Sequence, residues 1–317
     1  MDNITHTLIG VTLSNAGLKT KFGKGTTWIL AIASNLPDLD ILGGLFISGE
    51  SHFYRRMLTH SVFGMPIIAF LAALIFKKIF KEQKFSVILG LVLGGMAIHL
   101  FFDFVNSYGV VPFYPFSKER YELAWIFIID LILLSILIFP FILSKIKTKW
   151  TSLEFLSTVS IRSVMAYVMI CGLFHAMSKQ MFSKWLTNQG QKTDFQYIFP
   201  EPFGPHRFRG VSRTDQEYKS SLIEVLNNKV TPAFKTKTEF KNSDIERILK
   251  SAEGQKLNRF FKAPAWELDQ EKSSKDGLTR IWKASDLRFT SILLNRGNFF
   301  SYRFEVTDNS VNYLGRN

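Results

Sequence analysis

The chain contains a single cysteine, Cys171, so no intrachain disulfide can form and a zinc site built from thiolates is excluded. Any metal site must therefore use histidine and carboxylate ligands. Acidic residues are scarce as well: 26 Asp and Glu stand against 39 Lys and Arg and leave a formal net charge of +13. A basic segment ahead of the first apolar stretch is also lacking, so we expect no cleavable signal peptide.

Hydrophobic residues make up 47% of the chain and are concentrated before residue 180. We therefore predict a mainly α chain, with a multi-pass transmembrane helical bundle over 1–177 and a small, basic α+β soluble domain over 178–317. A shorter amphipathic run, 4–18, is a short span, a re-entrant helix or an interfacial helix. Five other runs approach the length of about 20 residues that spans a bilayer: 27–47, 61–80, 85–106, 122–144 and 158–177.

Basic residues between these runs predict the orientation of the chain. Lysines cluster after 4–18, after 61–80 and after 122–144, whereas the alternate loops 48–60 and 107–121 hold few cations. The positive-inside rule places the lysine loops in the cytoplasm. The expected location is the bacterial-type cytoplasmic (inner) membrane, with the C-terminal domain extracytoplasmic.

Six ionisable residues lie inside or beside the apolar runs. Such a side chain costs several kcal/mol in a membrane-length apolar run unless it is paired. In the predicted orientation all six fall within roughly 14 Å of the outer membrane boundary, at about 1.5 Å per helical residue. Their shared depth predicts one buried polar site, most simply a metal centre. The six residues are His6, Asp38, Asp40, His60, His99 and Asp103.

The spacing of these residues bears on how they can meet. His99 and Asp103 are four residues apart on a predicted helix, so both project from one face, a turn apart. Asp38 and Asp40 would diverge by about 200° on a regular helix. Both reach one site only if the chain is kinked or unwound near Pro37; otherwise one binds the metal and the other orients a ligand. Imidazole and carboxylate together suit zinc, iron or manganese.

Each of these residues also has a purely structural interpretation. A lone histidine in an apolar helix is more often packed or hydrogen-bonded than bound to a metal. Residues 37–40 are compatible with a turn that carries solvated acids, and His60 with a helix cap. Arg55 and Arg56 are compatible with a solvated pair at a helix end. The common depth of the six residues favours the joint metal interpretation.

Several short motifs occur in a fixed order over residues 1–145, and together they resemble the YdjM/YfhP group of membrane-bound metal-dependent hydrolases. In the C-terminal part, Asp286-Leu-Arg288-Phe289 resembles the end of the YfhP-like subgroup. The motifs are Met1-Asp-x-x-Thr5-His6-x-Leu8-x-Gly10, Ser34-Asn35-Leu36-Pro37-Asp38-Leu39-Asp40, Arg56-x-x-Thr59-His60-Ser61, His99-x-x-x-Asp103, Asn106-Ser-Tyr108-Gly109, Tyr114-Pro115-Phe116 and Trp125-x-x-x-x-Asp130.

The resemblance carries expectations about chemistry. The group is similar to the zinc-dependent phospholipase C and single-strand nuclease superfamily, an all-α fold with His and Asp zinc sites. The resemblance implies a hydrolase that uses a divalent metal, with zinc as the first expectation. Implied metal ligands are His6, Asp38, Asp40, His60, His99 and Asp103, with Asp130 as a further ligand or supporting residue.

In such an enzyme, Asp38 or Asp40 is expected to hold or deprotonate the attacking water. Asn35 and Asp130 are expected to support the ligands. Arg55 and Arg56 are expected to bind a phosphate or a lipid headgroup of the substrate.

A site near the outer leaflet predicts an amphiphilic substrate, such as a phospholipid or a lipid-linked phosphate. The expected function is hydrolysis of phosphoester or ester bonds by a membrane-bound enzyme. Its expected partner is the lipid bilayer, and nucleic acid is not expected. Two alternatives stay open: a transporter or ion pathway, and a non-catalytic, metal-stabilised membrane protein.

Residues 178–317 combine basic and aromatic side chains. Stretches 215–229 and 242–262 read as amphipathic helices, whereas 278–293 and 298–308 alternate polar and apolar residues as half-buried strands do. Attraction to anionic lipid headgroups accounts for the basic charge.

Overall fold

The computed structural model describes residues 1–40, 53, 55–146, 152–191, 193, 195–214, 216–274, 277–295 and 300–316. The chain divides into two compact units. The helical unit comprises the described residues of Met1–Phe46, Tyr54–Leu173 and Phe203–Pro205. The sheet unit comprises those of Ile47–Phe53, Phe174–Pro202 and His206–Asn317.

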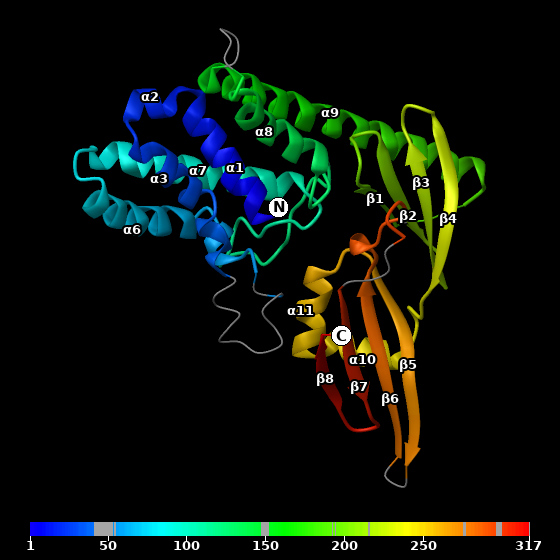
Figure 1. Cartoon of the computed structure of the whole chain (residues 1–317). Coiled ribbons are helices and arrows are strands. Elements are labelled where there is room, and N and C mark those ends of the chain that lie inside the picture. Colours follow the sequence, from blue (N-terminus) through cyan, green and yellow to red (C-terminus); the bar gives the residue numbers. More distant parts are fainter. Residues whose placement is uncertain are drawn as a thin grey trace. The chain divides into compact units, whose positions relative to one another are not determined.

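The helical unit is built from short and long helices (Figure 1). Its first helix begins after Asp2, whose carboxylate accepts the Thr5 N–H at 2.9 Å and caps the helix. The elements are α1 (Asn3–Leu13), the π-helical turn η1 (Ser14–Leu18), α2 (Lys19–Phe22), α3 (Gly25–Ala33), the 3-10 turns η2 (Leu36–Leu39) and η3 (Leu58–His60), α6 (Gly64–Ile79), α7 (Phe85–Val105), α8 (Leu131–Leu143) and α9 (Leu153–Asn188), the last of which continues into the sheet unit.

Helix α3 packs closely against both α1 and α7, and a glycine permits each contact. A Cβ added at Gly10 of α1 would lie 2.6 Å from the Leu30 carbonyl oxygen of α3. A Cβ added at Gly95 of α7 would lie 2.7 Å from the Ala33 Cβ. These contacts fix the C-terminal end of α3 against α7.

The expectation of a multi-pass transmembrane helical bundle is wrong. Among the described residues, two helices are long and apolar enough to cross a membrane, α7 and α9, and α8 is a shorter apolar helix. The chain also forms two antiparallel sheets of four strands each. Windows of apolar residues predicted continuous spans where the chain in fact breaks into shorter pieces.

The breaks have local causes. In the run 27–47, α3 ends at Ala33 and η2 begins with Pro37 in its first turn, and residues 41–47 lie outside the described residues. In the run 122–144, α8 begins only at Leu131, because the preceding segment is extended and Ile126 forms a bridge with Asn106. The run 61–80 yields α6, whose 16 residues rise about 24 Å, less than the ~30 Å hydrocarbon core.

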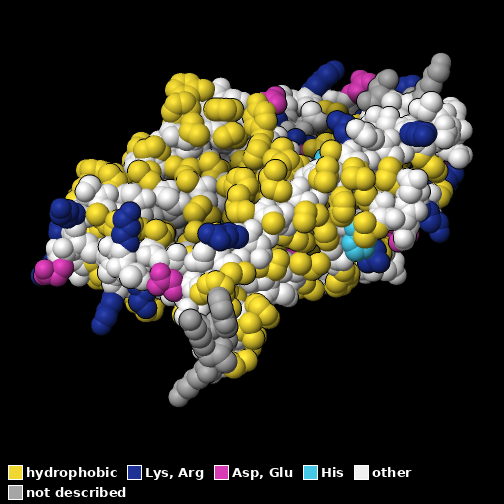
Figure 2. Space-filling model, turned by 90° about the horizontal axis from the view of Figure 1, so that it is seen from above, with side chains coloured by type: hydrophobic (Ala, Val, Ile, Leu, Met, Phe, Trp, Pro, Cys, Tyr) yellow, Lys and Arg dark blue, Asp and Glu magenta, His cyan; other side chains and the backbone are white. Residues whose placement is uncertain are grey.

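Hydrophobic side chains cover much of the face that Figure 2 shows. Large apolar residues are exposed along α8 and α9. Exposed apolar area of this extent marks a membrane or protein contact. On α8 these residues include Ile138, Phe139 and Ile142, and on α9 Phe155, Met169 and Leu173.

The sheet unit contains two antiparallel meanders separated by two helices (Figure 1). In the first sheet, Gly210 lets the Phe182 ring of α9 lie against the strand, since a Cβ there would be 2.7 Å from that ring. The elements are β1 (Gln196–Pro200), β2 (Arg207–Arg213), β3 (Glu217–Glu224), β4 (Lys229–Lys237), α10 (Ser243–Lys250), α11 (Ala252–Phe260), β5 (Pro264–Ser274), β6 (Gly277–Asp286), the 3-10 turn η5 (Leu287–Phe289), β7 (Ser301–Val306) and β8 (Val311–Arg316).

The local predictions for this part are partly right. The helical pattern of 242–262 is confirmed by α10 and α11, and strands occur within 278–293 and 298–308 as β6 and β7. The helix predicted over 215–229 is wrong, because that stretch holds β3 and the start of β4. β3 buries Tyr218, Ser220, Ser221 and Ile223, and the register shift at Ser220/Ser221 leaves buried residues three apart, as they are on a helix face.

The contact between α3 and α7 leads to a prediction about stability. Gly95→Ala forces a Cβ into Ala33 and is expected to lower the free energy of unfolding by about 1–3 kcal/mol. Gly94→Ala is the matched control, because a Cβ at Gly94 meets nothing within 4 Å. Thermal unfolding of the full chain in detergent micelles measures both variants. Equal transitions for the two would contradict the close packing of α3 on α7.

Candidate metal centre

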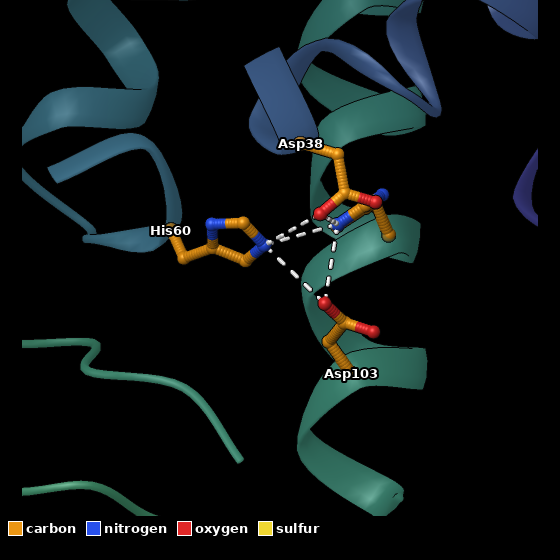
Figure 3. A group of neighbouring side chains, drawn as sticks. Asp38, His60 and Asp103 are labelled. Atoms are coloured by element: carbon orange, nitrogen blue, oxygen red, sulfur yellow. Dashed lines mark hydrogen bonds and ion pairs between the residues drawn. The ribbon is translucent and has the colours of Figure 1, made fainter. Parts of the chain in front are cut away.

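Four buried side chains from three separate segments converge in the helical unit. Asp38 Oδ1, His60 Nε2, His99 Nε2 and Asp103 Oδ2 all lie within 4.8 Å of one another. Figure 3 shows Asp38, His60 and Asp103 pointing toward one another. Each of the four residues is at most 4% exposed, so solvent does not separate them.

Local structure places each of these side chains. His99 and Asp103 lie an i, i+4 step apart on α7 and face the same way. Asp38 lies in η2, the 3-10 turn after α3, and His60 ends η3. Two of the ligand positions thus come from one regular helix, and the other two come from tight turns.

The distances fit a single small ion. The two imidazole Nε2 atoms are 3.1 Å apart. Asp103 Oδ2 is 3.3 Å from each Nε2, and Asp38 Oδ1 is 3.8 Å from each. A tetrahedral ion with ligand distances of about 2.05 Å requires about 3.3 Å between its ligand atoms. The four-atom group therefore needs little rearrangement to hold one.

The orientation of His99 is fixed from behind. Its Nδ1 lies 2.7 Å from the Ser34 carbonyl oxygen, which can only accept, so this nitrogen carries the proton. In the neutral ring, Nε2 then presents a lone pair to the group. Metal-binding histidines commonly donate their second ring nitrogen in this way.

His60 is held in a comparable manner. Its Nδ1 is 3.0 Å from Thr59 Oγ1 and 3.9 Å from Asp40 Oδ2. Burial lowers the pKa of His60 well below its ordinary value, so the ring is neutral at physiological pH. A neutral imidazole is the form that binds a metal.

Two carboxylate oxygens without a hydrogen bond supply a further test of the fit. Asp38 Oδ1 and Asp103 Oδ2 are buried and make no hydrogen bond, although Arg55 and Arg56 lie within ion-pair distance of them. Buried polar atoms are rarely left so in folded proteins, and an ion is one of the ordinary explanations. Together with the two imidazole Nε2 atoms, these oxygens form a donor set suited to a divalent cation.

Asp40 lies outside the four-atom group, on the far side of His60. Its Oδ2 accepts the backbone N–H of Arg56 at 2.5 Å, and its Oδ1 is buried without a partner. Burial raises the pKa of Asp40 above its ordinary value. The η2 turn therefore places Asp38 in the four-atom group, whereas Asp40 contacts His60 and Arg56.

Two arginines border the centre. Arg56 is 4% exposed, its Nε lies 3.0 Å from Asp103 Oδ2, and its guanidinium stacks 4.3 Å from the Tyr108 ring centre. Its φ of 60° is unusual for a residue other than glycine and is stabilised by the Asp40 contact. Arg55 Nη2 lies 3.9 Å from Asp38 Oδ1. The centre therefore combines anionic oxygens with cations that face the same space.

His6 lies beside the group without joining it. Its ring stacks on His99 with centroids 3.8 Å apart, and its Nε2 is 3.3 Å from Asp103 Oδ1, the oxygen that also contacts the Met1 amine. Both ring nitrogens are buried without hydrogen-bond partners. Burial lowers the pKa of His6 to about 3, so its ring is neutral.

Two predicted supporting residues lie elsewhere in the helical unit. Asp130 caps α8 by accepting the N–H groups of Ile132 and Leu133 at 3.0 Å, and it accepts the Tyr167 hydroxyl at 2.8 Å. Asn35 donates to Thr7 Oγ1 and to the Ala31 carbonyl. The structure assigns both to helix contacts and not to the four-atom group.

Some groups that support the metal centre are not evident from the sequence. The Ser34 carbonyl is a backbone group and leaves no trace in a side-chain pattern. Thr59 precedes His60 and Tyr108 lies in the Asn106–Gly109 motif, so their positions in the motifs were the only available signal. Arg120, which donates to the Gly109 and Arg55 carbonyls, reads from the sequence as an ordinary loop cation.

The position of Asp130 leads to a test. Asp130→Ala removes the cap of α8 and leaves the buried Tyr167 hydroxyl without its acceptor, which is expected to cost about 1–3 kcal/mol of unfolding free energy. Metal content per folded protein is expected to stay at the wild-type level. Unfolding in detergent and elemental analysis measure the two effects. A loss of metal with unchanged stability would place Asp130 in the centre.

Comparison with known proteins adds one match. A family model described as YdjM inner membrane protein matches residues 1–180, more than half of the chain. The matched residues include all four members of the group. No curated protein matches the chain, and no solved structure matches it.

Proposed function

The chain belongs to the YdjM inner membrane protein family, as its motifs predicted, and we propose that it is a membrane-bound, metal-dependent hydrolase of phosphoester or ester bonds. The observation that carries this proposal is the buried convergence of two carboxylate oxygens and two imidazole nitrogens. Its substrate is an amphiphile, such as a phospholipid or a lipid-linked phosphate. The apolar surface of α8 and α9 supports access from a bilayer.

Asp38, His60, His99 and Asp103 hold the metal in this proposal. Two imidazoles with two carboxylates and no thiolate would suit zinc, which can accept a fifth ligand and so would leave a position for water. When bound, the ion supplies Lewis acidity that activates water and polarises the ester. Ser34 and Thr59 keep the imidazoles oriented, and Asp103 balances the nearby Arg56 cation.

The neighbouring side chains orient the ligands and bind the substrate. Asp40 Oδ2, 3.9 Å from His60 Nδ1, acts through that imidazole by keeping it oriented toward the metal. Arg55 and Arg56 bind the anionic oxygens of the ester, because a guanidinium presents several donors in a fixed plane. The Tyr108 ring holds the Arg56 guanidinium in place.

The lysines that precede α7 support an orientation for that span. Lys77, Lys78, Lys81 and Lys84 lie before its first residue, and the positive-inside rule places this end in the cytoplasm. In this proposal, the centre in the last turns of α7 lies toward the outer leaflet.

Metal analysis is the first test. Purified full-length protein is expected to hold near-stoichiometric divalent metal, and His99→Ala combined with Asp103→Ala is expected to lower that content at least tenfold. Asp40→Asn is expected to weaken affinity by about 10-fold without abolishing binding. His206→Ala in the sheet unit is the matched control. Wild type without metal above the double variant would end the proposal.

A hydrolysis screen separates the enzyme from its alternatives. Metal-loaded protein in micelles is offered short-chain phospholipids and lipid phosphates, and phosphate or fatty acid release is measured. Cleavage that requires the metal and His99 supports the hydrolase. Stoichiometric metal without cleavage of any ester would identify a metal-stabilised membrane protein.

The arginines give a finer prediction once a substrate is found. Arg55→Ala removes one cation from the substrate side and is expected to raise KM by about 10-fold, the effect of losing one charged hydrogen bond. Metal content is expected to remain unchanged. Lys118→Ala, on the loop after α7, is the control. A normal KM for Arg55→Ala would remove Arg55 from the substrate site.

A further inference from the structure

A groove of about 390 Å³ lies along the last turns of α7 in the helical unit. His99 and Asp103 do not line it, because each is two residues from the lining residue Phe101 and projects about 200° around the helix from it. The groove is therefore separate from the metal centre. Four residues at helical spacing share one face of α7 and form its first wall: Ala97, Leu100, Phe101 and Phe104.

The second wall is the segment that follows α7, and its backbone is paired although it is irregular. Val110 and Tyr121 exchange both of their backbone hydrogen bonds, at 3.0 and 2.9 Å. Pro112 has no N–H, and its carbonyl accepts the Val62 N–H at 2.9 Å. Backbone groups that face hydrocarbon cannot pair with water, so a wall against lipid needs internal partners of this kind.

The side chains of the groove are apolar and outward-facing. Every described lining residue is aliphatic or aromatic. Phe113 is 48% exposed and Tyr121 is 42% exposed, and their rings meet edge to face with centres 6.0 Å apart. On the α7 wall Phe101 is 38% exposed, and Leu93, one turn before Ala97, is 36% exposed. The groove thus continues an apolar strip along a helix that is long and apolar enough to span a membrane.

We propose that this groove binds one hydrocarbon chain of a bilayer phospholipid. The chain lies between the α7 face and the rings of Phe113 and Tyr121. Lipid and protein side chains are about equally apolar, so the preference for this position comes from shape: two walls contact a chain on more sides than a single helix face does. The volume falls within the range of about 300–1,000 Å³ that small-molecule sites occupy. The site rests on the membrane location of the family and stands or falls without the hydrolase.

Photolabelling tests the site on the full chain. The protein is reconstituted in phosphatidylcholine vesicles that contain a small share of phosphatidylcholine with a diazirine on one acyl chain, and peptide mass spectrometry locates the label. Residues 97–121 are expected to be labelled about fivefold more than the exposed face of α8, because dispersion contacts add up along both walls. Equal labelling of the two regions in wild type would overturn the proposal.

Two variants remove the groove in different ways. Ala97 is exposed, so Ala97→Trp fills the groove from its rim and is expected to lower labelling of 97–121 to the α8 level. Leu93→Trp, on the same helix outside the lining, is its matched control and is expected to label as wild type does. Phe113→Ala opens the second wall and is expected to lower labelling several-fold.

Phe116→Ala is the control for the loop variant, because that ring is 81% exposed and lies outside the lining. It is expected to leave labelling unchanged. Thermal unfolding in detergent and metal content establish that each variant is folded. Undiminished labelling of 97–121 in folded Ala97→Trp or folded Phe113→Ala would overturn the proposal.

Discussion

The close approach of α3 to α7 is the constraint on which the metal centre depends. Gly95 permits it, and it brings the Ser34 carbonyl at the end of α3 to within 2.7 Å of His99 Nδ1 on α7. That bond sets the tautomer of His99 and aims its Nε2 at the group. The turn that follows α3 then carries Asp38 across to the same point. If the two helices lay farther apart, the hydrogen bond that orients His99 would be lost and Asp38 would also be displaced.

Burial gives this arrangement its chemical character. The two carboxylate oxygens and His99 Nε2 are buried acceptors, and His60 Nε2 joins them when the proton of its neutral ring is on Nδ1, toward Thr59. Such a group is unfavourable by itself and becomes favourable when a cation occupies its centre. Arg56 offsets part of the Asp103 charge, but its Nε, 3.0 Å from Asp103 Oδ2, makes no hydrogen bond with that oxygen. The arrangement therefore fits a bound cation better than an ion-pair network.

Local spacing predicted the regular part of the site and failed at its irregular parts. The pair His99 and Asp103 follows from helical geometry alone, because α7 is a continuous helix. The spacing did not decide which of Asp38 and Asp40 enters the site. Their roles depend on a 3-10 turn whose direction is set by contacts with α7 and His60. Asp130 shared the expected depth but caps α8, and a depth estimate does not distinguish a capping residue from a ligand.

The prediction of continuous spans failed for a related reason. Hydropathy measures apolar content, whereas the breaks after Ala33 and before Leu131 arise from backbone pairing and proline.

The distribution of polar residues along α7 bears on the choice between an enzyme and a conduit. From Phe85 to Ile98 this helix has no ionisable side chain, and its ionisable residues begin with His99. Charged or polar groups that carry an ion across a bilayer have to recur along the path, because each desolvated stretch is costly. On α7 they occur at one end only, together with two arginines from the segment before α6. A cluster of ionisable groups at one end of α7, with Arg55 and Arg56 beside it, suits a single binding site better than a path along the helix.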